Sequence, residues 1–145
     1  MKEGMAMAET LRVGLAVLGA WWMLAGHVAA EEVTPVEKVL SNPSAFHRHD
    51  VVLRGGLKLI GEWQGKDTFG MPTCGSIFQL DDQTGEIPVV YIIRCDPSER
   101  QRVNGLAVGR VSVRGNVEAQ TVIKMNSGME LRTRVMATNI RREEK

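Results

Sequence analysis

The stretch GSIFQLDDQTGEIPVVYIIRC, residues 75–95, decides the fold. It places an apolar run, an acidic turn that ends in Gly85 and a second apolar run one after another. β-Branched and aromatic residues on both sides of a glycine-containing turn are typical of a β-hairpin. The stretch therefore predicts two neighbouring strands, with Cys74 and Cys95 at the open end of the hairpin.

Cys74 and Cys95 are the two cysteines of the chain. If Thr84 and Gly85 are the two turn residues, the hairpin register places the cysteines directly opposite each other, where a disulfide can form. A longer turn would shift this register. The alternatives are a redox-active pair, or a soft-metal site that also uses Met71. We favour a structural disulfide that restrains the neighbouring loop, because such a bond suits an oxidising compartment.

The first 30 residues predict a leader that directs export. The apolar run 13–26 is followed by small residues, which fits a signal peptide cleaved after Ala30, although the preceding segment carries little positive charge. The alternative is an uncleaved membrane anchor, since residues 13–30 are just long enough to span a bilayer. Both interpretations place residues 31–145 outside the cytoplasm, in the periplasm.

The length and composition of the chain indicate one globular domain. The chain has 145 residues, of which 43% are hydrophobic and 24% charged, so the exported part is long enough for a single modest core. The net charge of +1 gives no overall attraction to nucleic acid or to an anionic membrane. This charge is unevenly divided, however. Residues 31–96 carry 6 basic and 10 acidic side chains (−4), and residues 97–145 carry 10 basic and 5 acidic ones (+5).

The remaining elements follow from local patterns. A capping box at residues 34–37, with proline at the first helical position, predicts a short helix that ends near Leu40. Residues 50–60 alternate as a strand does, and Gly55 and Gly56 in their middle predict a bulge or bend. Residues 61–73 predict a loop. Beyond the hairpin, the pattern predicts a helical turn from Asp96 and strands at 110–119 and 130–140, with Val135, Ala137 and Asn139 on one face of the last strand.

Five strands, a glycine bend in the first and a helical link after the third predict a Greek-key barrel. The segment VEKVLSNPSAFHRHDVVLRGGL, residues 36–57, resembles the opening of small exported OB-fold domains of the tRNA-anticodon-binding-like type. The segment FQLDDQTGEIPVVY, residues 78–91, resembles their second hairpin. The resemblance covers most of residues 34–140 and implies a mainly β, five-stranded OB-fold barrel. It implies little about the ligand, because OB-folds bind many different ones.

The sequence predicts a non-catalytic binding module without a cofactor. The candidate ligand contacts are Trp63, Phe69 and Tyr91, on the barrel face and the 61–73 loop, and the partner would be an envelope protein, a peptide or a small ligand. Asp81 and Asp82 belong to the hairpin turn rather than to a catalytic pair. His47 and His49 could ligate a metal, but the sequence offers no clear third ligand, so we predict no metal site.

The alternative function is nucleic-acid or polyanion binding through the basic last two strands. Its candidate contacts are Arg110, Arg114, Arg132 and Arg134. Single-stranded nucleic acid needs a positive groove with several aromatic stacking platforms. Aromatic residues are few, at 5% of the chain, and an export signal separates the protein from most nucleic acid, so this function ranks second.

Overall fold

The computed structural model describes residues 30–124 and 128–144. Over these residues the elements follow in the order α1 (Val36–Ser41), α2 (Pro43–Phe46), β1 (Asp50–Lys66), β2 (Pro72–Asp81), β3 (Glu86–Ile93), α3 (Pro97–Asn104), the 3₁₀ turn η1 (Gly105–Ala107), β4 (Arg110–Lys124) and β5 (Gly128–Arg142). The predicted leader lies outside the described residues, apart from Ala30. No helix in the described ranges combines the length and the apolar character that a membrane crossing requires.

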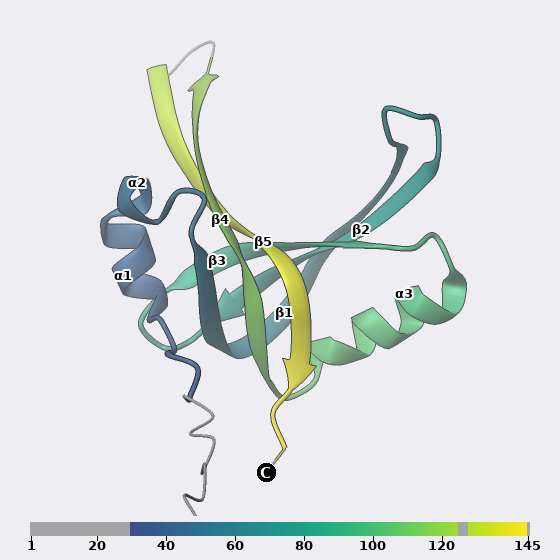
Figure 1. Ribbon diagram of the computed structural model, residues 1–145, viewed down its shortest axis with the longest axis horizontal. Coiled ribbons are helices and arrows are strands. Elements are labelled where there is room, and N and C mark those ends of the chain that lie inside the picture. Colours follow the sequence, from purple (N-terminus) through teal and green to yellow (C-terminus); the bar gives the residue numbers. More distant parts are fainter. Residues whose placement is uncertain (1–29, 125–127, 145) are drawn as a thin grey trace, which may run out of the picture.

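The strands pair in the order β1-β2-β3-β5-β4, and the pairing of β4 with β1 closes the ring (Figure 1). Neighbouring strands are antiparallel except β3 and β5, which run parallel over three registered pairs. The five-stranded barrel predicted from the sequence is therefore confirmed. Its strand order, with α3 between β3 and β4, agrees with the OB-fold that the resemblance implied.

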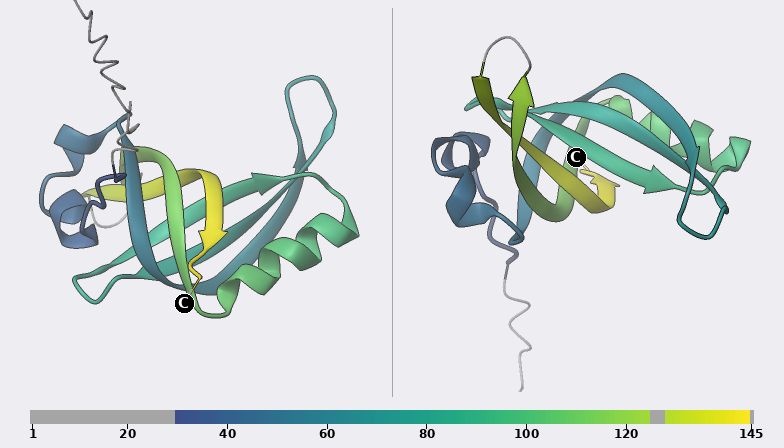
Figure 2. Two further views of the ribbon diagram at one scale, coloured as in Figure 1. Left: turned by 60° about the horizontal axis from the view of Figure 1, so that its bottom comes forward. Right: turned by 90° about the horizontal axis from the view of Figure 1, so that it is seen from above.

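The barrel interior is filled by one face of every strand. Phe78 on β2, Val89 on β3 and Val135 on β5 occupy facing positions, and each is fully buried. Figure 2 shows α1 and α2 at one side of the barrel and α3 at the other. Val36 and Val39 of the first group, and Val103 and Leu106 near the second, extend the same core.

β1 bends where the two glycines were expected to bend it. It pairs with β4 up to Gly56 and with β2 from Gly56 onward, so this point is a corner of the barrel. A Cβ on Gly55 would overlap the carbonyl oxygen of Asp81, so only glycine permits this approach. A further irregularity in the β1–β2 pairing falls between Leu59 and Gly61.

The prediction of a loop over residues 61–73 is wrong. β1 continues to Lys66 and pairs with β2 from Pro72, so the connecting loop is only residues 67–71. The prediction failed because Gly61 and Gly65 interrupt the apolar alternation of the strand. The hydrogen bonds of this part of β1 come instead from its partner β2, as the long hairpin in Figure 1 shows.

The predicted hairpin register is also wrong, although the disulfide is confirmed. Asp81 pairs with Glu86, so the turn is longer than two residues and Cys74 pairs with Ile93. Cys95 is therefore a diagonal neighbour of Cys74, with a Cα–Cα separation of 5.1 Å, and the two form a disulfide. The Asp82 carboxylate explains the longer turn, because it accepts hydrogen bonds from the backbone N–H groups of Thr84 and Gly85.

The capping box predicted for α1 does not form. Pro35 occupies the N-cap position, and no side chain of the same segment caps the helix. Instead, the β2–β3 turn caps it. The Val36 N–H donates to Asp82 Oδ2 at 2.8 Å, and the Glu37 N–H donates to Thr84 Oγ1 at 3.1 Å.

The predicted faces of the last strand hold only as far as Ala137. Arg114 pairs with Asn139 while Gly115 pairs with Ala137, so Thr138 is an extra residue in β5. This bulge reverses the alternation, so Ile140 rather than Asn139 is buried in the same core as Val135. The Thr138 hydroxyl donates to the Arg114 carbonyl at 3.2 Å, which satisfies part of the interrupted ladder.

Candidate binding face

The outer surface of the sheet carries a band of apolar side chains. Directly opposed residues of paired strands share a face. Trp63 on β1 and Ile92 on β3 therefore flank Gly75 of β2 on one side of the sheet, whereas Ile77 and Val90 form the next row on that side. Met136 of β5 continues the second row. We call Trp63, Ile77, Val90, Ile92 and Met136 the Trp63 face.

Trp63 has a defined position on this face. Its indole ring lies against Gly75, where an added Cβ would overlap Nε1 and the neighbouring ring carbons. It also lies 3.7 Å from the place that a Cβ on Gly65 would take. The two glycines therefore leave the space in which the ring lies flat on the sheet. Trp63 is half-buried, and Ile92 beside it is 53% exposed.

Further apolar side chains lie at the end of the β1–β2 hairpin. Phe69 is 89% exposed and Met71 is 62% exposed. The loop that holds them is ordered by Asp67, whose Oδ1 accepts the backbone N–H groups of both residues at 2.9 Å. Gly70 adopts φ +77°, which a residue with a side chain rarely does. The loop thus presents two large apolar side chains to solvent on a shaped backbone.

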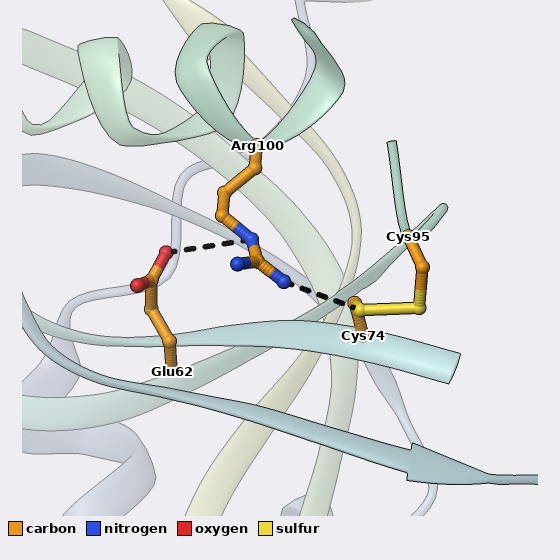
Figure 3. Close-up of a disulfide and its surroundings, with 4 residues drawn as sticks. All are labelled: Glu62, Cys74, Cys95 and Arg100. Carbon is orange, nitrogen blue, oxygen red and sulfur yellow. Dashed lines mark hydrogen bonds and ion pairs between the residues drawn. A yellow bond between two sulfur atoms is a disulfide. The ribbon is translucent and has the colours of Figure 1, made fainter. Parts of the chain in front are cut away.

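The opposite side of the same hairpin is polar and faces α3. Glu62 Oε1 accepts a hydrogen bond from Asn104 Nδ2 at 2.9 Å and lies 3.9 Å from Arg100 Nε. The Asn104 side-chain oxygen in turn accepts from the hydroxyl of Ser76, which is fully buried, at 3.4 Å. Arg100 also donates from Nη2 to Cys74 Sγ at 3.4 Å, so its guanidinium lies between the Glu62 carboxylate and the disulfide (Figure 3).

The structure separates the three predicted aromatic contacts. Trp63 lies on the outer face and Phe69 at the hairpin end, but Tyr91 pairs with Ser76 and packs against the core. The hydrogen bonds that the Arg102 guanidinium donates to the Glu99 carboxylate, and after them its hydrogen bond with the Tyr91 hydroxyl, raise the pKa of Arg102 above its ordinary value. Tyr91 is therefore directed towards α3 and does not belong to the Trp63 face.

The four predicted arginines do not form one basic surface. Each makes an ion pair with a glutamate: Arg110 with Glu143, Arg114 with Glu31, Arg132 with Glu130 and Arg134 with Glu118. On β4 and β5 they are also separated along the strands, with Arg110 and Arg114 near one end of the β4–β5 pair and Arg132 and Arg134 towards the other. Each of the four arginines therefore has a carboxylate partner within the molecule, although Arg110 shares Glu143 with Arg54.

The two histidines take part in local structure. His47 Nδ1 lies 3.1 Å from the Ala119 N–H, and His49 Nδ1 lies 2.7 Å from the Ala45 carbonyl. Among the described residues, no group of three or more histidine, cysteine or acidic side chains could hold a metal ion.

Several of these residues escaped sequence reasoning. The sequence places Ile77 and Ile92 in the hairpin but does not show that they lie on the same side of the sheet as Trp63. The register of the hairpin differs from the predicted one by two residues, so Cys74 pairs with Ile93 and not with Cys95. Arg100 and Asn104 lie in a polar segment that shows no contact signal in the sequence. The one available signal was Gly75, a glycine inside a strand, which indicates close approach by another group.

No protein-family model and no curated protein matches the sequence. Solved structures similar in fold include the second OB-fold domain of replication protein A from Methanococcus maripaludis, with 16% identity and a TM-score of 0.48 over 79% of this chain and 97% of that one. An OBody bound to hen egg-white lysozyme has 18% identity and a TM-score of 0.46 over 77% and 94%. The small single-stranded DNA-binding protein from Streptomyces coelicolor has 9% identity and a TM-score of 0.39 over 65% and 94%.

Proposed function

We propose that the protein is a non-catalytic binding module whose Trp63 face docks an apolar segment of another protein. The observation that carries the proposal is the indole of Trp63, held flat on Gly75 beside the exposed Ile92. Tryptophan, phenylalanine and methionine are enriched in the buried centres of protein interfaces. The Trp63 face, together with Phe69 and Met71, presents all three residue types.

The distribution of charge favours a protein over a nucleic acid. Nucleic-acid affinity depends on cations that are free to neutralise phosphates. The arginines of β4 and β5 named above are paired with glutamates, and Tyr91 is directed away from Trp63, which leaves one aromatic ring on the Trp63 face. A row of stacked bases would need more than one such ring.

We further propose that residues 31–145 act in the periplasm, after removal of a signal peptide that ends at Ala30. The Cys74–Cys95 disulfide supports this location, because disulfides form and persist in oxidising compartments. The protein expressed with its leader should be recovered from the periplasmic fraction with an intact mass that begins at Glu31. A mass that retains residues 1–30 in the membrane fraction would instead support the anchor.

The docking proposal is tested by site-specific photo-crosslinking in the native envelope. A photoreactive residue replaces Ile92 on the Trp63 face or, as the control, Ser112 on β4. We expect a defined protein adduct from position 92, its loss with Trp63→Ala, and no equivalent adduct from position 112. Equal adducts from both positions, no adduct, or an adduct that survives Trp63→Ala contradicts the proposal.

Purified protein that begins at Glu31 distinguishes the nucleic-acid alternative, because Trp63 is then its one tryptophan. Single-stranded DNA is titrated at low and at moderate salt, and Trp63 emission is followed. We expect no saturable change. Saturable quenching that weakens as the salt concentration rises would overturn the protein-docking proposal in favour of nucleic acid.

A further inference from the structure

The two sulfur atoms of the disulfide lie in different surroundings. Cys74 is fully buried in β2, whereas Cys95, just after β3, is only partly buried. Cys95 also borders a pocket of about 520 Å³ between α3 and the end of β1. The other residues that line this pocket are polar or small: Gln64, Asp96, Pro97, Arg100, Gln101 and Asn104. Cys95 is therefore the more accessible of the two cysteines.

A positively charged side chain, that of Arg100, contacts the buried sulfur atom of the disulfide. Arg100 Nη2 donates to Cys74 Sγ at 3.4 Å, and the same guanidinium is held from its other side by Glu62, 3.9 Å from Nε (Figure 3). Arg102, two residues later on α3, pairs with Glu99 instead. A neighbouring guanidinium stabilises a thiolate relative to a thiol. Of the two sulfur atoms, Cys74 Sγ is thus the one that accepts a hydrogen bond from a guanidinium, which favours it as the leaving group.

We propose that this disulfide is a thiol-exchange site with a fixed direction, in which a small thiol such as glutathione attacks Cys95 Sγ. The incoming thiolate forms a bond to Cys95 Sγ, the Cys74–Cys95 bond breaks, and its electron pair leaves on Cys74 as a thiolate beside Arg100. The product is a mixed disulfide on Cys95. This proposal does not depend on the Trp63 face.

The geometry also determines how the mixed disulfide is resolved. The Cys74 thiolate stays buried and close to Cys95, so it can attack Cys95 Sγ, expel the small thiolate and restore the original bond. Alternatively, a second small thiolate attacks the sulfur of the first, which releases the small-molecule disulfide and leaves both protein cysteines reduced. Two electrons then pass from the two small thiols to the protein.

Peptide mapping tests the direction of attack. The whole protein is treated with reduced glutathione, quenched in acid and digested. We expect glutathione on Cys95 and not on Cys74. Two single-cysteine variants are then treated with glutathione disulfide: Cys74→Ser retains only Cys95, and Cys95→Ser retains only the buried Cys74. Cys74→Ser should react at least about tenfold faster than Cys95→Ser. Glutathione on Cys74, or equal rates, overturns the proposal.

The role of Arg100 is tested by the rate at which glutathione opens the disulfide. Arg100→Gln should slow opening by roughly threefold or more, because the leaving thiolate loses its stabilising charge. Arg100→Lys should retain most of the rate. Arg102→Gln, on the same helix but paired with Glu99, is the matched control and should leave the rate unchanged. Thermal unfolding of the oxidised variants identifies any variant that opens faster only because its fold is weakened. An unchanged rate in Arg100→Gln, or equal slowing in Arg102→Gln, contradicts the proposal.

Discussion

At the scale of single residues, Gly75 decides how the proposed binding face is built. The absence of a side chain at this position lets the Trp63 indole lie against the backbone of β2. The ring thereby loses conformational freedom before any partner arrives, and a preorganised anchor costs less to dock. The Trp63 face accordingly depends on a glycine as much as on the tryptophan.

We expect Gly75→Ala to displace the Trp63 ring. A Cβ there overlaps the indole, and overpacking of this kind costs about 1–3 kcal/mol. The emission of Trp63, the one tryptophan beyond the leader, should change, and the free energy of unfolding in urea should fall. Gly56→Ala is the control, because a Cβ there meets nothing within 4 Å. If both variants leave emission and stability unchanged, the packing of Trp63 on Gly75 is not as described.

At the scale of elements, one turn organises two parts of the fold. Partial burial raises the pKa of Asp82. The hydrogen bonds that its carboxylate accepts from Val36, Thr84 and Gly85 outweigh that effect and hold this pKa below its ordinary value. The same carboxylate therefore closes the β2–β3 turn and caps α1 across 46 residues of sequence. Asp96 has a similar local role at α3, where the hydrogen bond from the Ser98 N–H lowers its pKa.

Replacement of Asp82 by alanine should lower the free energy of unfolding by about 1–2 kcal/mol at pH 7, as loss of a helix cap does. Because the pKa of Asp82 is lower in the folded protein than the unfolded value of about 3.9, its contribution is fully present above that value. The contribution is lost as the pH falls through the folded-state pKa. The stability difference between wild type and Asp82→Ala should therefore shrink in acid, as measured by urea unfolding at several pH values.

Asp81→Ala provides the comparison for this prediction. Asp81 is the exposed neighbour of Asp82 and accepts one backbone hydrogen bond, from Gln83 at 2.7 Å. Its loss should cost less than the loss of Asp82, which serves both the turn and the helix. The prediction is contradicted if Asp81→Ala and Asp82→Ala lower the free energy of unfolding equally. It is also contradicted if the stability difference between wild type and Asp82→Ala grows in acid.

At the scale of the whole molecule, stability depends on the row that joins β2, β3 and β5. Phe78, Val89 and Val135 are fully buried there, and Val89 and Val135 belong to the short parallel pairing of β3 with β5. The exposed side chains of the proposed docking surface lie apart from this core: Phe69 and Met71 are at the hairpin end, and Ile92 is on the Trp63 face. Core packing and the proposed docking can therefore be changed separately.

Substitutions at two phenylalanines, Phe78 and Phe69, test this division. Phe78→Ala should cost about 3–5 kcal/mol, which brings the domain close to unfolding, and Phe78→Leu should cost less. Phe69→Ala removes a side chain that is 89% exposed and should change stability by no more than about 0.5 kcal/mol. Thermal unfolding monitored by circular dichroism gives the order of stability of the three variants. A large loss in Phe69→Ala would mean that the hairpin end packs against the barrel.

The sequence by itself determined the features that depend on neighbouring residues. Alternating apolar side chains and the glycine-containing turn identified the hairpin, Gly55 and Gly56 marked the corner of β1, and the two cysteines had one possible intramolecular pairing. These features follow from local backbone chemistry. Strand count and barrel class followed from them.

Only the tertiary structure decided which distant groups meet. Three features depend on contacts between segments far apart in the sequence. They are the cap that Asp82 provides for α1, the bulge at Thr138 where β5 pairs with β4, and the contact of Arg100 with Cys74. A one-residue change in register or alternation reverses which side chains face inward, and local patterns do not contain that information. The placement of Trp63 on Gly75 likewise depends on the pairing of β1 with β2, in a segment whose own sequence resembled a loop.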